Sequence, residues 1–164
     1  LLNVAPLVRS LDFIDSANLF LYGESRGGMM VLQALREGFP ARAAAVFGAF
    51  TDLEGLLETD PDRYQPLISK IWPDFSQRKE EILKRRSALS WAESINTPLL
   101  LMHGSADGSV PPEQTLRLAL RLQELDKSYE LIVFDGADHI LSQRRNERDR
   151  HVLDWFERHR TTRD

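Results

Sequence analysis

Short apolar runs recur along the chain, at Leu19 to Tyr22, Ala43 to Phe47, Pro98 to His103 and Glu130 to Phe134. Each is four to six residues long and contains few or no polar side chains. Runs of this kind, without regular polar alternation, are typical of strands buried on both faces of a parallel sheet. The pattern therefore predicts about four buried strands.

Helical spacing of apolar residues separates these runs. It predicts a short helix or helix tail over Leu1 to Ala17 and helices over about Arg26 to Glu37, Pro112 to Leu125 and Asn146 to Arg160. Strands that alternate with helices form right-handed crossovers, so we expect a mostly parallel α/β sheet with helices on both faces. The last helix is expected to bury Val152, Leu153, Trp155 and Phe156.

The stretch from Thr51 to Asn96 has a different character, because prolines interrupt it and no apolar run crosses it. We interpret residues 51–96 as a helical insertion within a single domain that spans residues 1–164. A charged helix is expected within Ser76 to Leu89. Its basic cluster Lys84-Arg85-Arg86 is expected to form a solvated face, supported by helix-spaced ion pairs with Glu80 and Glu81.

Composition narrows the function classes. The chain has 164 residues, 42% hydrophobic and 28% charged, which suits one globular domain with a substantial core. Its formal charge of -4 gives no general attraction for nucleic acid, and no apolar run approaches the roughly 18 residues that cross a membrane. Cysteine is absent, which excludes disulfides, thiolate metal sites and a cysteine nucleophile. The compartment stays open, with the cytoplasm slightly favoured.

The first apolar run leads directly into Gly23-Glu24-Ser25-Arg26-Gly27, with Gly28 next and a helical pattern after it. Strand, Gly-x-Ser-x-Gly and helix together predict a nucleophile elbow, a sharp turn that exposes a serine hydroxyl. The flanking glycines are expected to prevent collisions between strand and helix. Serine needs a base and an orienting acid to act as a nucleophile, so the motif predicts chemistry only if both follow.

Two further strands end on suitable groups, Asp107 after the third run and His139 after the fourth. The carboxyl ends of parallel strands lie at one edge of a sheet, so Ser25, Asp107 and His139 can meet there. Serine, acid and histidine in this order are typical of α/β-hydrolases. We expect Ser25 as nucleophile, His139 as base, Asp107 as its orienting acid and the Arg26 backbone N–H as an oxyanion donor.

Other polar residues are alternatives to these candidates. Asp135 and Asp138 are expected to form turns, and His103 is expected to make local hydrogen bonds at a strand end. No arrangement of His, Asp and Glu has metal-ligand spacing, and no cofactor is expected. Several aromatic residues are candidates either for a substrate pocket or for the core, with the core favoured for each: Phe50, Tyr64, Trp72 and Trp91.

The motifs resemble those of the prolyl oligopeptidase family of serine peptidases. The resemblance rests on Gly23 to Gly28, on His103-Gly104-Ser105-Ala106-Asp107 with Val110-Pro111, on Gly136-Ala137-Asp138-His139, and on the lead-in Ser94 to Leu101. It covers the whole chain and corresponds to the C-terminal half of the family's catalytic domain. It implies a partial α/β-hydrolase fold and cleavage of peptide bonds through an acyl-enzyme.

The resemblance also implies parts of the family's proteins for which the residues before the elbow, Leu1 to Leu21, are too few. These are earlier strands, a second oxyanion donor and a propeller domain. Loss of one oxyanion donor lowers turnover by roughly 10² to 10³. We therefore expect an apparently truncated domain with weak or no activity alone, and an elbow strand whose exposed edge invites pairing with another chain.

Three functions stay open from the sequence. The favoured one is a serine peptidase that acts on peptide or small acyl substrates. A carboxylesterase would use the same three side chains, so the motif does not separate the two. The third is a non-catalytic fragment or interaction module that retains the three residues as ancestry.

Overall fold

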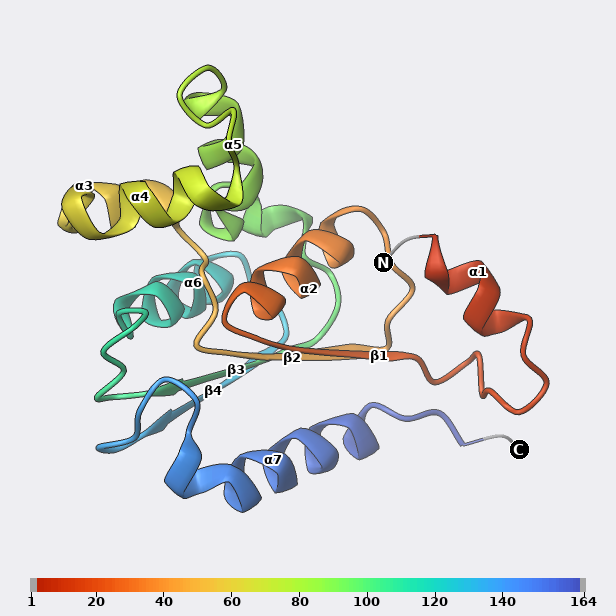
Figure 1. The fold of residues 1–164 in the computed structure, drawn as a ribbon. Coiled ribbons are helices and arrows are strands. Elements are labelled where there is room, and N and C mark those ends of the chain that lie inside the picture. The colour runs from red at the N-terminus through yellow and green to blue at the C-terminus, as the bar shows by residue number, and fades with distance from the viewer. Residues whose placement is uncertain (1–2, 163–164) are drawn as a thin grey trace.

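A parallel four-stranded sheet lies at the centre of the protein (Figure 1). It is seen in a computed structural model that describes residues 3–162. The strands are β1 (Phe20–Glu24), β2 (Ala43–Phe47), β3 (Leu99–Gly104) and β4 (Tyr129–Phe134), hydrogen-bonded in that order. All three pairings are parallel. The predicted parallel α/β architecture is confirmed.

Helices cover both faces of this sheet (Figure 1). One face carries α2 (Arg26–Arg36) and α6 (Glu113–Glu124), and the opposite face carries α7 (Arg145–Arg158). Successive residues of β2 and β3 alternate between the two layers. Ala44, Val46, Leu99 and Leu101 pack on the α2 and α6 side, whereas Ala43, Ala45, Phe47, Leu100 and Met102 pack on the α7 side. Both central strands are therefore apolar except at His103 of β3, because neither face is solvated.

Strand β1 differs from the expectation that it is buried on both faces. Tyr22 is 43% exposed and Glu24 is also exposed. The reason is position: within residues 3–162, β1 has a neighbouring strand on one side only. Its other side presents backbone groups that no strand of the described chain pairs. Association of this edge with another chain remains a prediction.

The segment between β2 and β3 is helical. It contains α3 (Leu53–Thr59), α4 (Pro61–Ile71), α5 (Lys79–Arg86) and the 3₁₀ segment η1 (Ala88–Ser94). Its apolar side chains form a cluster of their own around Leu56, Tyr64 and Ile68, which also includes Met29 of α2 and Val110. Through these two residues the helical segment packs directly against the end of the sheet where the elbow lies.

The charged helix was predicted well in position but not in its pairing. Lys84 and Arg85 of α5 face solvent as expected, whereas Arg86 lies over the ring of Trp72. Glu81 pairs with Arg78 rather than with the basic cluster. Arg78 precedes the helix by one residue, so its guanidinium reaches forward to Glu81 in the first turn, where acidic side chains are favoured.

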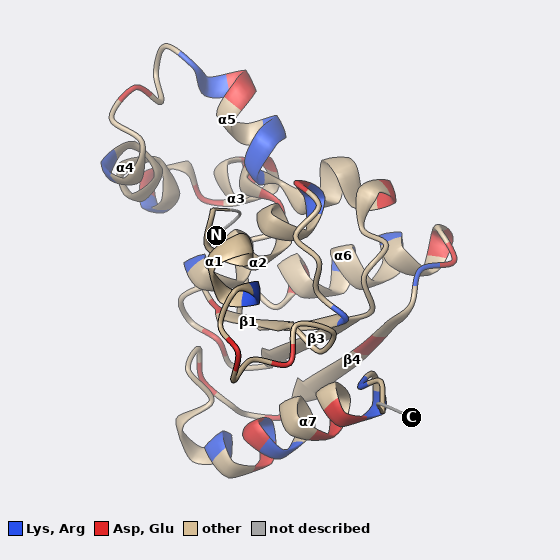
Figure 2. Ribbon diagram, turned by 90° about the vertical axis from the view of Figure 1, so that its right-hand side faces the viewer, with Lys and Arg blue, Asp and Glu red and all other residues tan. Residues whose placement is uncertain are grey.

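Two other expectations are wrong in detail. Helix α1 (Val4–Arg9) ends well before Ala17, and it buries only Ala5, so it has no apolar face to extend it. Leu153 of α7 is 68% exposed, while its neighbours Val152 and Trp155 are buried. One residue turns the helix by about 100°, which carries Leu153 away from the sheet. Figure 2 shows the acidic and basic residues along α7.

A helix that crosses a membrane has to be both long and apolar. Among the described residues, none of the helices combines the length and apolarity that a bilayer crossing requires.

Candidate active site

Ser25 occupies a strained turn between β1 and α2. Its φ of 50° and ψ of -122° lie outside the regions that L-residues normally adopt, and such strain persists only where the surroundings enforce it. The Ser25 N–H donates to the carbonyl oxygen of Phe47 on β2 at 2.9 Å, which fixes the turn to the neighbouring strand. The Ser25 hydroxyl does not cap α2, so it is left available. This is the geometry of a nucleophile elbow.

The glycines around the turn have unequal roles. A Cβ on Gly23 would lie 2.5 Å from the carbonyl oxygen of Gly27, and a Cβ on Gly28 would lie 2.7 Å from the Cβ of Ala49. A Cβ on Gly27 would meet nothing within 4 Å. The expectation that Gly27 prevents a collision is wrong in the described structure. The close approach of helix to strand depends on Gly23 and Gly28.

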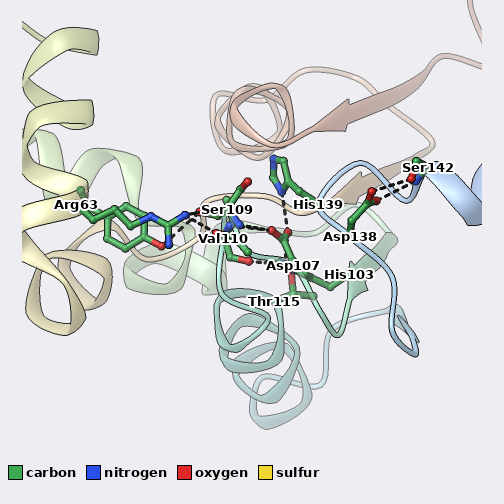
Figure 3. A network of polar contacts seen from close by, with 11 residues as sticks. Arg63, His103, Asp107, Ser109, Val110, Thr115, Asp138, His139 and Ser142 are labelled. Carbon is green, nitrogen blue, oxygen red and sulfur yellow. Dashed lines mark hydrogen bonds and ion pairs between the residues drawn. The ribbon is translucent and has the colours of Figure 1, made fainter.

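Asp107 and His139 meet at the carboxyl ends of β3 and β4 (Figure 3). The His139 Nδ1 lies 2.7 Å from the Asp107 Oδ2. A carboxylate only accepts hydrogen bonds, so Nδ1 carries the proton and donates it to Asp107. The other ring nitrogen, Nε2, is then the basic atom of the neutral imidazole.

The Asp107 carboxylate is fully buried and accepts four hydrogen bonds. Its Oδ1 accepts from the backbone N–H groups of Ser109 at 2.8 Å and Val110 at 2.9 Å, and its Oδ2 faces His139 and the Nε2 of His103, 3.0 Å away. Burial alone raises the pKa of Asp107, but the hydrogen bonds from His103, His139 and the two backbone groups outweigh it and hold this pKa well below its usual range. Asp107 is therefore an anion at neutral pH.

His103 makes the local hydrogen bonds that were expected, and one contact that was not. Its Nε2 lies 3.0 Å from both the Val110 carbonyl oxygen and the Asp107 Oδ2, and its Nδ1 lies 2.6 Å from the Thr115 Oγ1. Because both partners of Nε2 are acceptors, this nitrogen must carry the proton. The side chain is 1% exposed. His103 thus helps to position the Asp107 carboxylate through its Nε2. Its place at the end of a strand did not reveal this role.

Ser25 and His139 line the same pocket, but no hydrogen bond joins their side chains among the described residues. Nucleophile–base contacts are often long in unliganded enzymes. The hydrogen bond to Asp107 raises the pKa of His139, although burial opposes the change. The structure therefore brings acid and base into contact and places the serine beside them.

Gly48, at the end of β2, is a site residue that the sequence did not indicate. Its φ is +53°, and a Cβ there would lie 3.1 Å from both Cε1 and Nδ1 of His139. Only glycine combines this conformation with such a close approach of a ring. The tight packing of Gly48 under His139 limits where the imidazole can lie.

Helix α4 ties the Asp107 loop to the helical segment (Figure 3). Asp60 caps the helix by accepting from the Arg63 N–H at 3.1 Å, and Pro61 fills the first helical position. From the same turn, the Arg63 guanidinium donates to the Gly108 and Ser109 carbonyl oxygens, and the Tyr64 hydroxyl donates to Ser109 at 3.3 Å. Two side chains of α4 thus hold the loop that carries Asp107.

A pocket of about 560 Å³ opens beside Ser25 and His139. Phe50 and Tyr64 line this pocket and also belong to the core of the helical segment. Each is therefore both a pocket residue and a core residue. Trp72 is partly buried and lines a narrow apolar space next to the pocket. Trp91 belongs to the core under α2 and α6, as the favoured interpretation has it.

The remaining polar candidates lie outside this arrangement. Asp138 accepts from the N–H and hydroxyl of Ser142, at 3.0 and 2.7 Å, which fits the turn role expected for it. Asp135 receives a long hydrogen bond from Ser105. His159 bonds the carbonyl of Trp155 within α7. In the part of the chain that the structure describes, no three His, Asp or Glu side chains are grouped so as to hold a metal ion.

Comparison with known proteins places this chain in a family. The model of the prolyl oligopeptidase family, a peptidase family, matches residues 1–162. The chain belongs to the prolyl oligopeptidase family. The resemblance found from the motifs is thereby confirmed.

Relatives within the family agree with the fold. The chain is 36% identical to the peptidase YuxL of Bacillus subtilis over 84 residues, which are 48% of this chain and 13% of YuxL. A puromycin-hydrolyzing peptidase of Mycobacterium tuberculosis superposes with a TM-score of 0.71 at 29% identity, over 84% of this chain and 21% of that one. The Pyrococcus horikoshii acylaminoacyl peptidase superposes with a TM-score of 0.79 at 21% identity, over 98% and 27%. The chain thus spans about a quarter or less of these three family members.

Proposed function

We propose that this protein is a serine peptidase in which Ser25, His139 and Asp107 act together on an amide bond. Membership of a peptidase family supports the reaction class. The observation that carries the residue assignment is the 2.7 Å contact between His139 and Asp107, beside a serine held in an elbow and lining the same pocket.

The proposed reaction begins with attack of the Ser25 Oγ on the substrate carbonyl carbon, while the His139 Nε2 takes the hydroxyl proton. The imidazolium that forms is stabilised by the buried Asp107 carboxylate through Nδ1. His139 then gives the proton to the leaving amine, and the amide C–N bond breaks to leave an acyl ester on Ser25. Water attacks this ester with His139 again as base, which releases the acid and restores the serine.

The backbone N–H of Arg26 is the proposed oxyanion donor. Arg26 is the first residue of α2, so its N–H has no acceptor in its own helix, and it bonds to no other described residue. The positive end of the helix dipole adds to its effect on a developing oxyanion.

Labelling with a fluorophosphonate tests the proposal, because this probe reacts with activated serines. We expect the purified protein to be labelled on Ser25, and the label to disappear in Ser25→Ala. The matched control is Ser76→Ala, which removes an exposed serine that makes no side-chain hydrogen bond, and labelling should persist in it. A folded protein that resists labelling would contradict the proposal and favour an interaction module.

A substrate panel then separates the two enzymatic interpretations. Related proteins are named for puromycin and for acylaminoacyl substrates, so the panel contains aminoacyl amides, acylaminoacyl amides and matched esters. Amide cleavage that Ser25→Ala abolishes supports the peptidase. Turnover confined to esters would replace it with the carboxylesterase.

A further inference from the structure

Three basic side chains surround the pocket at Ser25. Arg26 comes from the first turn of α2, and Arg63 and Lys70 come from α4. Apart from His139, the remaining lining residues are apolar or carry hydroxyl groups, and none of the lining residues is an aspartate or a glutamate. The chain as a whole is acidic, with a formal charge of -4. The pocket therefore has the opposite sign of charge from the chain that forms it.

These cations are not neutralised by carboxylates. Arg26 and Lys70 are exposed and form no ion pair or side-chain hydrogen bond among the described residues. The Arg63 guanidinium bonds only to carbonyl oxygens and lies over the Tyr64 ring, 5.2 Å from its centroid. Elsewhere on the surface many arginines do have carboxylate partners, and these include Arg78, Arg121, Arg144 and Arg158.

The acids near the pocket do not cancel this charge. The Asp107 side chain is completely buried behind His139, with four hydrogen bonds to its oxygens. Glu24 and Asp60 are close enough to act on the pKa values of His139 and Tyr64, but neither lines the pocket. Asp60 also uses one oxygen to cap α4. An entering ligand therefore meets the three cations directly.

We propose that this pocket selects substrates that carry a carboxylate next to the bond to be cleaved. The inference rests on the proposed function, since it concerns the substrate of the same site. A carboxylate that enters a pocket lined by Phe50, Leu67 and Ile71 is partly removed from water, where attraction to the three cations is stronger than on an open surface. Two sources supply this chemistry, an Asp or Glu side chain and the free C-terminus of a short peptide.

Binding to the Ser25→Ala protein tests the inference without requiring turnover. Three peptides of equal length isolate the charge: acetyl-Ala-Ala-Glu-amide, acetyl-Ala-Ala-Gln with a free carboxylate, and the neutral acetyl-Ala-Ala-Gln-amide. We expect at least one of the charged peptides to bind about 5-fold tighter or more than the neutral one. Tighter binding of acetyl-Ala-Ala-Glu-amide indicates recognition of a side-chain carboxylate. Tighter binding of acetyl-Ala-Ala-Gln indicates recognition of a C-terminal carboxylate. The preference should shrink between about 0.02 M and about 0.5 M NaCl.

Lys70→Gln removes one cation without disturbing a hydrogen bond and should reduce the preference about 2- to 5-fold. The matched control is Lys84→Gln, which removes an exposed lysine of α5 that does not line the pocket, and it should leave the preference unchanged. Equal binding of all three peptides, or equal effects of the two lysine variants, would overturn the inference. Failure of Ser25 to react with the fluorophosphonate while charged peptides still bind tighter would overturn the proposed function alone.

Discussion

Replacement of Gly48 by alanine should slow the chemistry of Ser25 without a contact to Ser25 itself. The added methyl carbon would lie 3.1 Å from Cε1 and Nδ1 of His139 and 3.3 Å from its carbonyl oxygen. Ordinary contacts of this kind are a few tenths of an ångström longer, so the ring has to move. The ring is also hydrogen-bonded to Asp107 at 2.7 Å, and a shift away from Gly48 disturbs that bond.

Two separate effects add up in this variant. Alanine at the φ of +53° destabilises the fold by about 1–2 kcal/mol, since the left-handed region is unfavourable for a residue with a Cβ. Displacement of the imidazole by a few tenths of an ångström should lower the rate of fluorophosphonate labelling by about 10-fold, given that a misplacement of about 1 Å costs about 100-fold.

Gly38→Ala is the matched control for the first effect. Gly38 follows α2 with a φ of +81°, and a Cβ there would meet nothing within 4 Å. Both variants should lose similar stability in urea unfolding, but only Gly48→Ala should label slowly. Equal labelling rates in two equally folded variants would refute the positioning role of Gly48.

Four further expectations follow from the same geometry. Gly28→Ala should lose stability and labelling, whereas Gly27→Ala, which meets open space, should retain both; unfolding and labelling of the pair test this. In Asp107→Asn the hydrogen bond that raises the pKa of His139 loses its charge, so NMR titration of His139 should give a lower midpoint than in the wild type. Labelling of the wild type should rise with pH through that raised pKa, since neutral imidazole is the base. His103→Leu leaves buried polar groups unsatisfied and should lower the free energy of unfolding by about 2–4 kcal/mol, measured in urea.

Apolar patterning was sufficient to find the sheet but not its edges. Ala43–Phe47 is buried at every residue, and the sequence predicted it with these bounds. The run before Ser25 is just as apolar, yet Tyr22 is 43% exposed. An apolar run shows that a strand is suited to burial on both faces. Whether it is buried depends on neighbouring elements from elsewhere in the chain, which the run itself does not reveal. For a similar reason the sequence could not tell that Leu153 turns away from the sheet.

Strand ends also located the candidate site, because parallel strands deliver their loops to one edge. This rule predicts from the sequence alone that Ser25, Asp107 and His139 lie in one region. It could not find Gly48, whose role depends on the close approach of a ring 91 positions further along the chain. Nor could it find the contact from His103 to Asp107, since the loop between them folds back on itself.

The loop from Asp107 to Val110 connects the proposed catalytic residues to the proposed substrate site. Its first residue holds His139, and its Ser109 carbonyl oxygen accepts from both Arg63 and Tyr64 of α4. Helix α4, which carries two of the three proposed carboxylate-binding cations, Arg63 and Lys70, is thus attached to the loop that contacts His139. A carboxylate drawn toward Arg63 competes with the carbonyl oxygens of this loop for the same guanidinium. If the proposed roles hold, substrate charge acts on the Asp107–His139 pair through one hydrogen-bonded segment. The proposed substrate site on α4 and the position of His139, the proposed base, then depend on the same helix.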